Sequence, residues 1–445
     1  MSSNGISRRN FLKAGAGLGA LAAMGAPGRA FATAAGDYKA LVCIYMAGGN
    51  DGNNLIIPLD AARYGAYQAA RSALAIPQGK LAPTSFMHGS MPYALHYGLP
   101  KLHARYLQGR VAMVLNVGNL IEPLTRAEYV SKLKPAPQQL FSHSDQTMQI
   151  QMGVPREDGT GWGGRLLDCV SAGNKSLGGI STSSSPAPFV VSSIDSGNTI
   201  PGGTDLNLAG LNLWPASAGL TRRQAIVGLL SSDGGSPLRA AANRAFADGL
   251  QLAADLAAAS SATPLKTVFP GTSIGKQLQQ IAGLVQLRAA QGPGRQVFIA
   301  SLGSFDTHSG QDWQQWNLFT QIDDAVDAFH KAMELDLKLA DKVTTISLSE
   351  FGRTLQSNGV GSDHGWGSHH FVVGGAVQGG LYGQLPGFAL GGADDATNRG
   401  VWIPKRSTEQ LGYTLGRWFG ASDDELVWAF PSVAKFATAD LGFMG

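Results

Sequence analysis

The chain has 445 residues, of which 44% are hydrophobic, 15% are charged and 59 are glycines. This composition argues against disorder and predicts a compact globular protein with many turns, built as one large domain or two ordinary ones. The formal charge is +3, but residues 1–32 hold four basic and no acidic residues, so without them +3 falls to −1. The sequence therefore predicts no basic patch for nucleic acid or anionic lipid.

The N-terminus predicts export from the cytoplasm. The segment "SRRNFLK" (7–13) is followed by a weakly apolar run (14–24) and by "AFA" (30–32). This order is typical of a twin-arginine signal peptide spanning 1–32, and a disordered basic tail is the weaker alternative. The apolar run is too short to cross a bilayer, which needs ~20 residues. We expect the twin-arginine (Tat) machinery to deliver the protein to the periplasm or outside the cell, with no integral membrane segment.

Short apolar runs alternate with helical patterns along the mature chain. Apolar runs without polar alternation predict strands covered on both faces, and their alternation with helices is typical of an α/β layered fold. In chain order we expect a strand at 39–46, a helix at 59–72, a strand at 110–118, helices from 236 and from 273, a strand at 296–303, a helix from 316 and a strand at 342–349. We expect one α/β domain over 40–445, with a helical insertion at about 195–290.

Two cysteines, Cys43 and Cys169, are too few for a disulfide scaffold or a thiolate metal site. We interpret both as small buried hydrophobic residues. The sequence does not decide whether they pair.

Polar motifs follow three of the four predicted strands. In an open α/β sheet the ligand crevice lies beyond the carboxyl ends of the strands, so Asp51, Asp306 and Glu350 are expected to converge. Asp306 and His308 are two residues apart and would project from one face of an extended segment, which suits two ligands of one metal. The motifs are "GGNDGNN" (48–54), which by itself reads as a turn, "SFDTH" (304–308) and "SEFGR" (349–353).

The segment "SDHGWGSHH" (362–370) adds more candidate ligands: Asp363, His364, His369 and His370. Adjacent residues of a strand point to opposite faces, so at most one of the last two is expected to join a shared site. An isolated histidine is usually a packed or surface residue. Imidazoles gathered with carboxylates, however, are the ligand set of Zn²⁺, Mn²⁺ or a similar divalent ion, and we predict such a site.

The segment "LFSHSDQTMQIQMG" (140–153) offers a candidate nucleophile. Ser142 is expected to begin a helix, where backbone N–H groups favour an anion or an alkoxide. The alternative is an ordinary serine N-cap, but a serine beside a metal can lose its proton near neutral pH. Arg353 and Asn53 are candidates for hydrogen bonds to a tetrahedral anion, with a salt bridge and a turn as the alternatives.

Taken in order, seven motifs resemble those of a twin-arginine-exported family of unknown function, DUF1501, which is placed in the alkaline phosphatase and sulfatase-like superfamily. The resemblance covers about residues 40–445. It implies an alkaline phosphatase-like α/β/α sandwich with a mostly parallel central sheet and a site for one or two divalent ions, Zn or Mn, at its carboxyl edge. The motifs are "GGNDGNN", "SHSDQ", "GTGWGGR", "FDTHSGQ", "SEFGRT", "DHG" and "GGAVQGG".

The resemblance also implies roles for single residues. Members commonly read Ser-His-Phe-Asp where this chain reads Ser-His-Ser-Asp, so Ser142 keeps the nucleophile position and Ser144 is a second candidate. The implied ligands are Asp51 and Glu350 for one metal, Asp306, His308 and His364 for the other, and Asp363 and His369 as further candidates.

Two classes of function follow. The first is an exported metal-dependent hydrolase of phosphate esters, acting on a small anionic ester with a serine nucleophile and with Arg353 steadying the charged oxygens. The second is a non-catalytic binding or accessory protein that keeps the metal for stability. A sulfate-ester hydrolase ranks lower because the chain lacks a Cys/Ser-x-Pro-x-Arg motif. A metal-free serine esterase ranks lower because no Gly-Asp-Ser block precedes Asn50 in the mature chain.

Overall fold

The fold is described from a computed structural model of the chain. The structure describes residues 38–153, 158–170, 178–194, 197–203, 211, 214–232, 234–262, 264–290 and 294–445. The predicted signal peptide, 1–32, lies outside the described residues. Two compact units divide the rest: one holds residues 205–258, and the larger holds residues 33–204 and 259–445.

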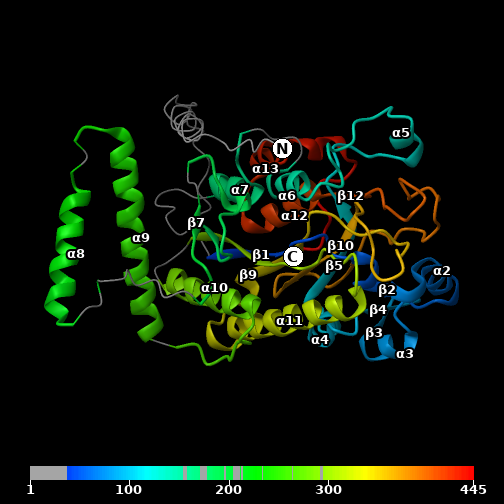
Figure 1. Cartoon of the computed structure of the whole chain (residues 1–445), viewed down its shortest axis with the longest axis horizontal. Coiled ribbons are helices and arrows are strands. Elements are labelled where there is room, and N and C mark those ends of the chain that lie inside the picture. Colours follow the sequence, from blue (N-terminus) through cyan, green and yellow to red (C-terminus); the bar gives the residue numbers. More distant parts are fainter. Residues whose placement is uncertain are drawn as a thin grey trace, which may run out of the picture. The chain divides into compact units, whose positions relative to one another are not determined.

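A mixed, largely parallel sheet forms the centre of the larger unit (Figure 1). Its strands are β1 (Lys39–Met46), β5 (Val111–Gly118), β6 (Gly179–Ser181), β7 (Asn198–Thr199), β8 (Arg295–Leu302), β9 (Val343–Leu348), β10 (Ser368–Gly374), β11 (Gly380–Tyr382) and β12 (Arg406–Ser407). Among the described strands the order is β11-β5-β10-β9-β1-β8-β6-β7, with β12 beside β5. Only β10 in this set runs antiparallel to its neighbours, β5 and β9.

The four strands predicted from apolar runs are confirmed as β1, β5, β8 and β9, each within one residue at either end. All residues of β5 and β9 are buried, and so are seven of the eight in β1. Strand β1 is hydrogen-bonded on both sides, to β8 and β9, so helices must cover its two faces and both faces must be apolar. The expected α/β class with a mostly parallel sheet is confirmed at this level.

Helices cover both faces of this sheet (Figure 1). They are α2 (Ala61–Arg71), α3 (Gln78–Leu81), α4 (Pro100–Leu107), α5 (Arg126–Val130), α6 (His143–Met152), α7 (Trp162–Val170), α10 (Ser273–Ala290), α11 (Gln311–Lys331), α12 (Thr408–Phe419) and α13 (Asp423–Ala429). The predicted helices at 59–72, from 273 and from 316 are confirmed as α2, α10 and α11, although α11 begins five residues earlier than expected.

The core on one sheet face joins β1 to α7 and α12. Leu41 and Cys43 of β1 pack in one cluster with Leu166 of α7 and Leu415 of α12. Cys169 belongs to the same cluster, and both cysteines are buried without a disulfide between them, so they act as small hydrophobic residues. Burial raises the pKa of the Cys43 thiol, which keeps it protonated.

A small antiparallel sheet, β2 (Ile56–Pro58), β4 (Met91–Leu95) and β3 (Ser85–His88), also belongs to the larger unit. Its residues Ile57 and Ala94 share a second core cluster with Tyr67 of α2 and Trp402. This cluster supports the segment that follows β1.

The unit of residues 205–258 contains α8 (Ala216–Leu230) and most of α9 (Pro237–Ala262). The helix predicted from residue 236 is confirmed as α9. The range 195–290 expected for a helical insertion is wider than this unit, because α10 packs against β8 in the larger unit.

Candidate metal centre

The candidate site lies at the carboxyl edge of the sheet. Because β1, β8 and β9 are parallel, the loops that follow them leave from the same edge. Strand β10 is antiparallel to β9, so the segment that leads into it reaches this edge as well. The convergence is direct: Gly48 N–H, after β1, donates to Glu350, after β9, over 2.8 Å.

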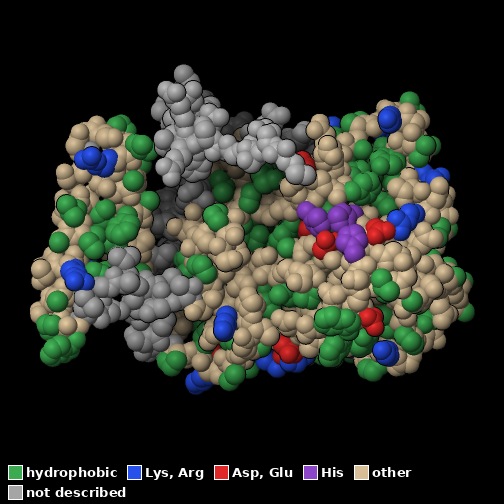
Figure 2. All heavy atoms as spheres, viewed as in Figure 1, with side chains coloured by type: hydrophobic (Ala, Val, Ile, Leu, Met, Phe, Trp, Pro, Cys, Tyr) green, Lys and Arg blue, Asp and Glu red, His purple; other side chains and the backbone are tan. Residues whose placement is uncertain are grey.

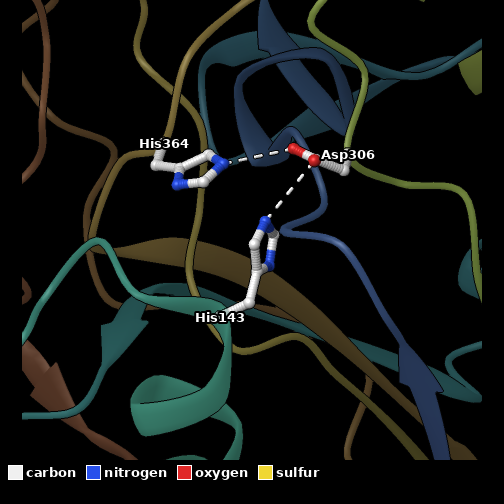
Figure 3. A group of neighbouring side chains, drawn as sticks. All are labelled: His143, Asp306 and His364. Atoms are coloured by element: carbon white, nitrogen blue, oxygen red, sulfur yellow. Dashed lines mark hydrogen bonds and ion pairs between the residues drawn. The ribbon is translucent and has the colours of Figure 1, made fainter. Parts of the chain in front are cut away.

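Four side chains form an exposed group that we call the histidine cluster: His143, Asp306, His308 and His364. Figure 2 shows histidine side chains gathered with acidic side chains on one face of the molecule. Asp306 Oδ1, His308 Nε2 and His364 Nε2 form a triangle with sides of 3.1, 3.1 and 3.2 Å. His143 Nε2 approaches Asp306 Oδ2 to 3.5 Å from another direction (Figure 3). Between 21% and 46% of each side chain is exposed, so a ligand can reach the cluster.

Each histidine of the cluster is oriented by an oxygen at its other ring nitrogen. The acceptors of the three Nδ1 atoms are Glu350 Oε1 for His143 (2.9 Å), Asp363 Oδ1 for His308 (3.1 Å) and Phe141 O for His364 (2.8 Å). An oxygen that only accepts requires the proton on Nδ1, which in a neutral ring leaves the lone pair on Nε2. In the neutral form that binds a metal, each ring would turn its Nε2 lone pair toward the Asp306 carboxylate, and carboxylates or carbonyls at Nδ1 are the usual second partners of metal-bound histidines.

The buried guanidinium of Arg353 stabilises the ionised form of Asp306. Its Nη1 donates to Asp306 Oδ1 over 2.7 Å and to the Gly48 carbonyl over 3.2 Å. Burial raises the pKa of Asp306, but the hydrogen bond and charge of Arg353 outweigh it, so the pKa lies below its usual value. The Arg353 side chain is 0% exposed. Its Nη1 and Nη2 already donate inside the protein, to Asp306, Gly48 and Ser362, and its Nε is buried, so the expected contact with a substrate anion stays a prediction.

The neutral form of His364, which can bind a cation, is favoured in this structure. Burial lowers the pKa of His364, and the nearby charge of Arg353 lowers it further, against the hydrogen bond to Phe141 that raises it. The ring is therefore neutral near pH 7, which is the form that binds a metal.

The spacing of the cluster fits the ligands of one ion. Ligand atoms at about 2.0–2.1 Å from a tetrahedral ion lie roughly 3.3 Å from one another. Four distances in the cluster are 3.1 to 3.5 Å: three join Asp306 Oδ1, His308 Nε2 and His364 Nε2, and the fourth joins His143 Nε2 to Asp306 Oδ2. The ligand atoms of His143, Asp306 and His364 all lie within 4.8 Å of one another. A donor set of imidazoles with a carboxylate suits Zn²⁺ better than Mg²⁺ or Ca²⁺.

Asp51, expected as a metal ligand, lies in a buried network. Its side chain is 1% exposed and pairs with Arg71, which is 0% exposed. Its carboxylate also accepts from the backbone and side-chain nitrogens of Asn53, both at 3.0 Å, and from Gln311. Four internal donors use both oxygens, so the structure gives Asp51 a supporting role instead of the expected one.

Asn53 and Glu350 are also buried supports. Asn53 accepts from Trp402 Nε1 over 2.7 Å and donates to Asp51, so it cannot meet a substrate anion as expected. Glu350 accepts from Tyr45 Oη over 3.0 Å and from His143 Nδ1. Its place behind His143 makes it a positioning residue where a direct ligand was expected.

Ser142 is the N-cap of α6. Its Oγ accepts from the Asp145 backbone N–H over 3.4 Å and donates to the Asp145 carboxylate. Ser144 Oγ lies 3.1 Å from Ser142 Oγ and 3.2 Å from the same carboxylate. In the sequence Ser142 lies between Phe141, whose carbonyl accepts from His364, and His143, a member of the cluster. In the part of the chain that the structure describes, no serine hydroxyl is hydrogen-bonded to a histidine ring, so a Ser-His pair is not formed there.

The two further candidates, Asp363 and His369, lie in different surroundings. Asp363 orients His308 and pairs with Arg399 over 2.6 Å, so it adjoins the cluster. His369 is buried in β10, and its Nδ1 accepts from the Asn116 N–H over 2.9 Å. Burial lowers the pKa of His369 to about 3. His370 is buried as well, so neither of these adjacent histidines reaches the cluster.

His143 is the cluster member that the sequence did not single out. The motif "SHSDQ" predicts a serine nucleophile. It also places a histidine at the start of a helix beside the predicted metal site, which indicates a further candidate ligand. It is the tertiary contact with Glu350 and Asp306 that reveals its place.

Comparison with known proteins supplies a family for part of the chain. Residues 219–400 match the family described as "Protein of unknown function (DUF1501)". The DUF1501 match includes Asp306, His308 and His364 but not His143, and it is shorter than the resemblance expected over 40–445. A search of curated proteins finds no match to the chain.

The export signal is also found. Residues 5–25 match the twin-arginine translocation signal, so the chain is handled by the Tat machinery and is exported to the periplasm or beyond. Among the described helices, none combines the length and apolar character that crossing a bilayer requires.

Proposed function

We propose that the protein is an exported metal-dependent hydrolase of phosphate esters whose ion is held by the histidine cluster. The observation that carries the proposal is the convergence of three imidazole Nε2 atoms on the Asp306 carboxylate, whose pKa lies below its usual value, with an oxygen at each Nδ1. Imidazole nitrogens and a carboxylate this close repel one another unless protons or a cation lie among them, and we assign a metal cation to that place. The helices on both sheet faces and the site at the carboxyl edge support the finer assignment to an alkaline phosphatase-like α/β/α sandwich in that superfamily.

The proposal is for one divalent ion, Zn or Mn, in place of the two that the resemblance allowed. His143, Asp306, His308 and His364 would hold it. Asp51 and Glu350, the ligands expected for another ion, are occupied by internal donors. When bound, the ion would act as a Lewis acid on the phosphoryl group.

The chain's own residues would then share the chemistry. Arg353 holds Asp306 ionised, and Glu350 and Asp363 hold two histidines in the required orientation. Ser142 Oγ would attack phosphorus and pass its proton to Asp145, the carboxylate it already contacts. The ester oxygen leaves with a proton from solvent, and water then cleaves the phosphoserine. Ser144, beside the same carboxylate, is the second candidate.

The deciding experiment measures metal per chain by elemental mass spectrometry on signal-free protein. We expect about one equivalent of a divalent transition metal, lost in a His308→Ala, His364→Ala double variant. His88→Ala is the matched control, since His88 is an exposed histidine outside the cluster. Metal-dependent turnover of a phosphomonoester and diester panel, lost in Ser142→Ala, would complete the support. No stoichiometric metal after reconstitution with Zn or Mn would overturn the proposal.

A second function, a non-catalytic exported protein stabilised by metal, draws on one observation. Ser142 makes the hydrogen bonds of an ordinary N-cap, which a nucleophile need not make. Bound metal that raises the melting temperature, together with no turnover of any ester in the panel, would favour this second function.

A further inference from the structure

A pocket of about 380 Å³ opens beside the histidine cluster. Its lining includes His308 and His364, so a molecule in the pocket touches the cluster directly. The volume lies near the lower end of the ~300–1,000 Å³ usual for ligand pockets, so it suits a small molecule and not a polymer.

The pocket has charged and apolar sides. Arg399 supplies the positive charge, and its side chain is 43% exposed, against 0% for Arg353. Phe141, which is 41% exposed, and Val401 supply apolar surface. An anion with an apolar substituent matches this combination.

Arg399 is held in place by Asp363, the same carboxylate that orients His308. Asp363 Oδ2 accepts from Arg399 Nη2 over 2.6 Å, while Asp363 Oδ1 meets His308 Nδ1 at 3.1 Å. Arg399 Nε also donates to Gln356 over 3.4 Å. Its Nη1 makes no hydrogen bond within the described part of the chain, so it remains available to an anionic oxygen.

We infer that this pocket binds the substrate and that Arg399 is its specificity-determining residue, selecting small phosphate monoesters whose alcohol portion is apolar. Arg399 contacts a phosphoryl oxygen while Phe141 packs against the alcohol portion. Asp363 is a positioning residue that joins anion recognition to the cluster. This inference rests on the proposed function, but its test reads binding as well as turnover.

The test titrates inorganic phosphate into metal-loaded, signal-free protein and measures the heat of binding by calorimetry. Arg399→Gln should weaken phosphate binding by about 10- to 100-fold, since a hydrogen bond to a charged group is lost. Arg399→Lys should fall between, because an ammonium keeps the charge but not the planar geometry. The matched control is Arg417→Gln, since Arg417 is 51% exposed and pairs with Asp440 over 2.7 Å elsewhere on the surface. Melting curves check that each variant folds.

Equal phosphate affinity in wild type and Arg399→Gln overturns the inference, and so does the absence of phosphate binding by the metal-loaded wild type. Phosphate binding that depends on Arg399, with no turnover of any ester, keeps the pocket and rejects the proposed hydrolase. Turnover of an ester by Arg399→Gln with the KM of the wild type keeps the proposed hydrolase and rejects the role of Arg399 in the pocket. Phe141→Ala should reduce the preference for phenyl phosphate over methyl phosphate, and an unchanged preference removes Phe141 from the pocket's role.

Discussion

Two aspartates at the same sheet edge have opposite surroundings. Asp51 follows β1, is 1% exposed and faces Arg71, which is 0% exposed. Asp306 follows β8, is 43% exposed and also has a buried arginine, Arg353. The internal donors of Asp51 occupy both its oxygens, whereas Asp306 Oδ2 still faces His143. The comparison teaches that residue type and sheet position do not decide whether a carboxylate is available to bind an ion. Its exposure and its internal hydrogen-bond donors decide this.

The largest expected effect is on stability, when the buried aspartate, Asp51, is replaced. Asp51→Ala leaves Arg71 as a buried charge without its carboxylate, which we expect to lower the free energy of unfolding by about 3–5 kcal/mol. Urea denaturation of signal-free protein measures it. The matched control is Asp341→Ala, which removes an exposed pair with Arg110 and should cost no more than about 1 kcal/mol. A stable Asp51→Ala protein that has lost its metal would show instead that Asp51 is a ligand.

The next effect concerns Asp323 of α11, a buried carboxylate held by backbone N–H groups. It accepts from Lys101 and Leu102 over 3.0 and 2.7 Å, and burial raises its pKa from 3.8 to about 6. A raised pKa in the folded state favours the protonated form, so this group's contribution is full below pH 3.8 and is lost as pH rises through about 6. A shift of this size corresponds to roughly 3 kcal/mol.

Unfolding measured from pH 4 to 7 tests this. Asp323→Asn should show a smaller loss of stability over that interval than wild type, because an amide does not titrate. If both proteins lose stability equally between pH 4 and 7, burial does not govern the protonation of Asp323.

A smaller effect tests the support of the exposed cluster. Glu350→Gln weakens the partner of His143 Nδ1, and loss of such a partner typically costs 10–100-fold in metal affinity. Competition with a chelator of known affinity measures it. Glu128→Gln, in the capping box of α5, is the control and should leave metal affinity unchanged. Unchanged affinity in Glu350→Gln would remove His143 from the ligand set.

The smallest effect separates a cap from a nucleophile. Ser142→Ala should destabilise the protein by about 1 kcal/mol and Ser142→Gly by only a few tenths, because glycine is a tolerable N-cap. Thermal unfolding measures the pair. If turnover is abolished in both variants while Ser142→Gly keeps its stability, Ser142 acts in the chemistry and not only as a cap.

Several features followed from the sequence alone. Short apolar runs without polar alternation placed β1, β5, β8 and β9 within a residue at either end, since such runs fit strands that are covered on both faces. The order of paired arginines, apolar run and small residues placed the export signal. Asp306 and His308, two residues apart, were expected in one site, and they lie together in the histidine cluster.

The tertiary structure decided which polar residues are exposed. Arg71 comes from α2, Gln311 from α11 and Trp402 from the segment between β11 and β12. Their donors make Asp51 and Asn53 buried supports. His143 enters the site only because α6 begins against the end of β9, and Arg399 because its loop meets Asp363. Local sequence sets which elements form, because apolar periodicity is a local property. The hydrogen-bond partners and exposure of a side chain depend also on segments far away in the sequence, such as Gln311 for Asp51 and Trp402 for Asn53, and only the folded chain brings these together.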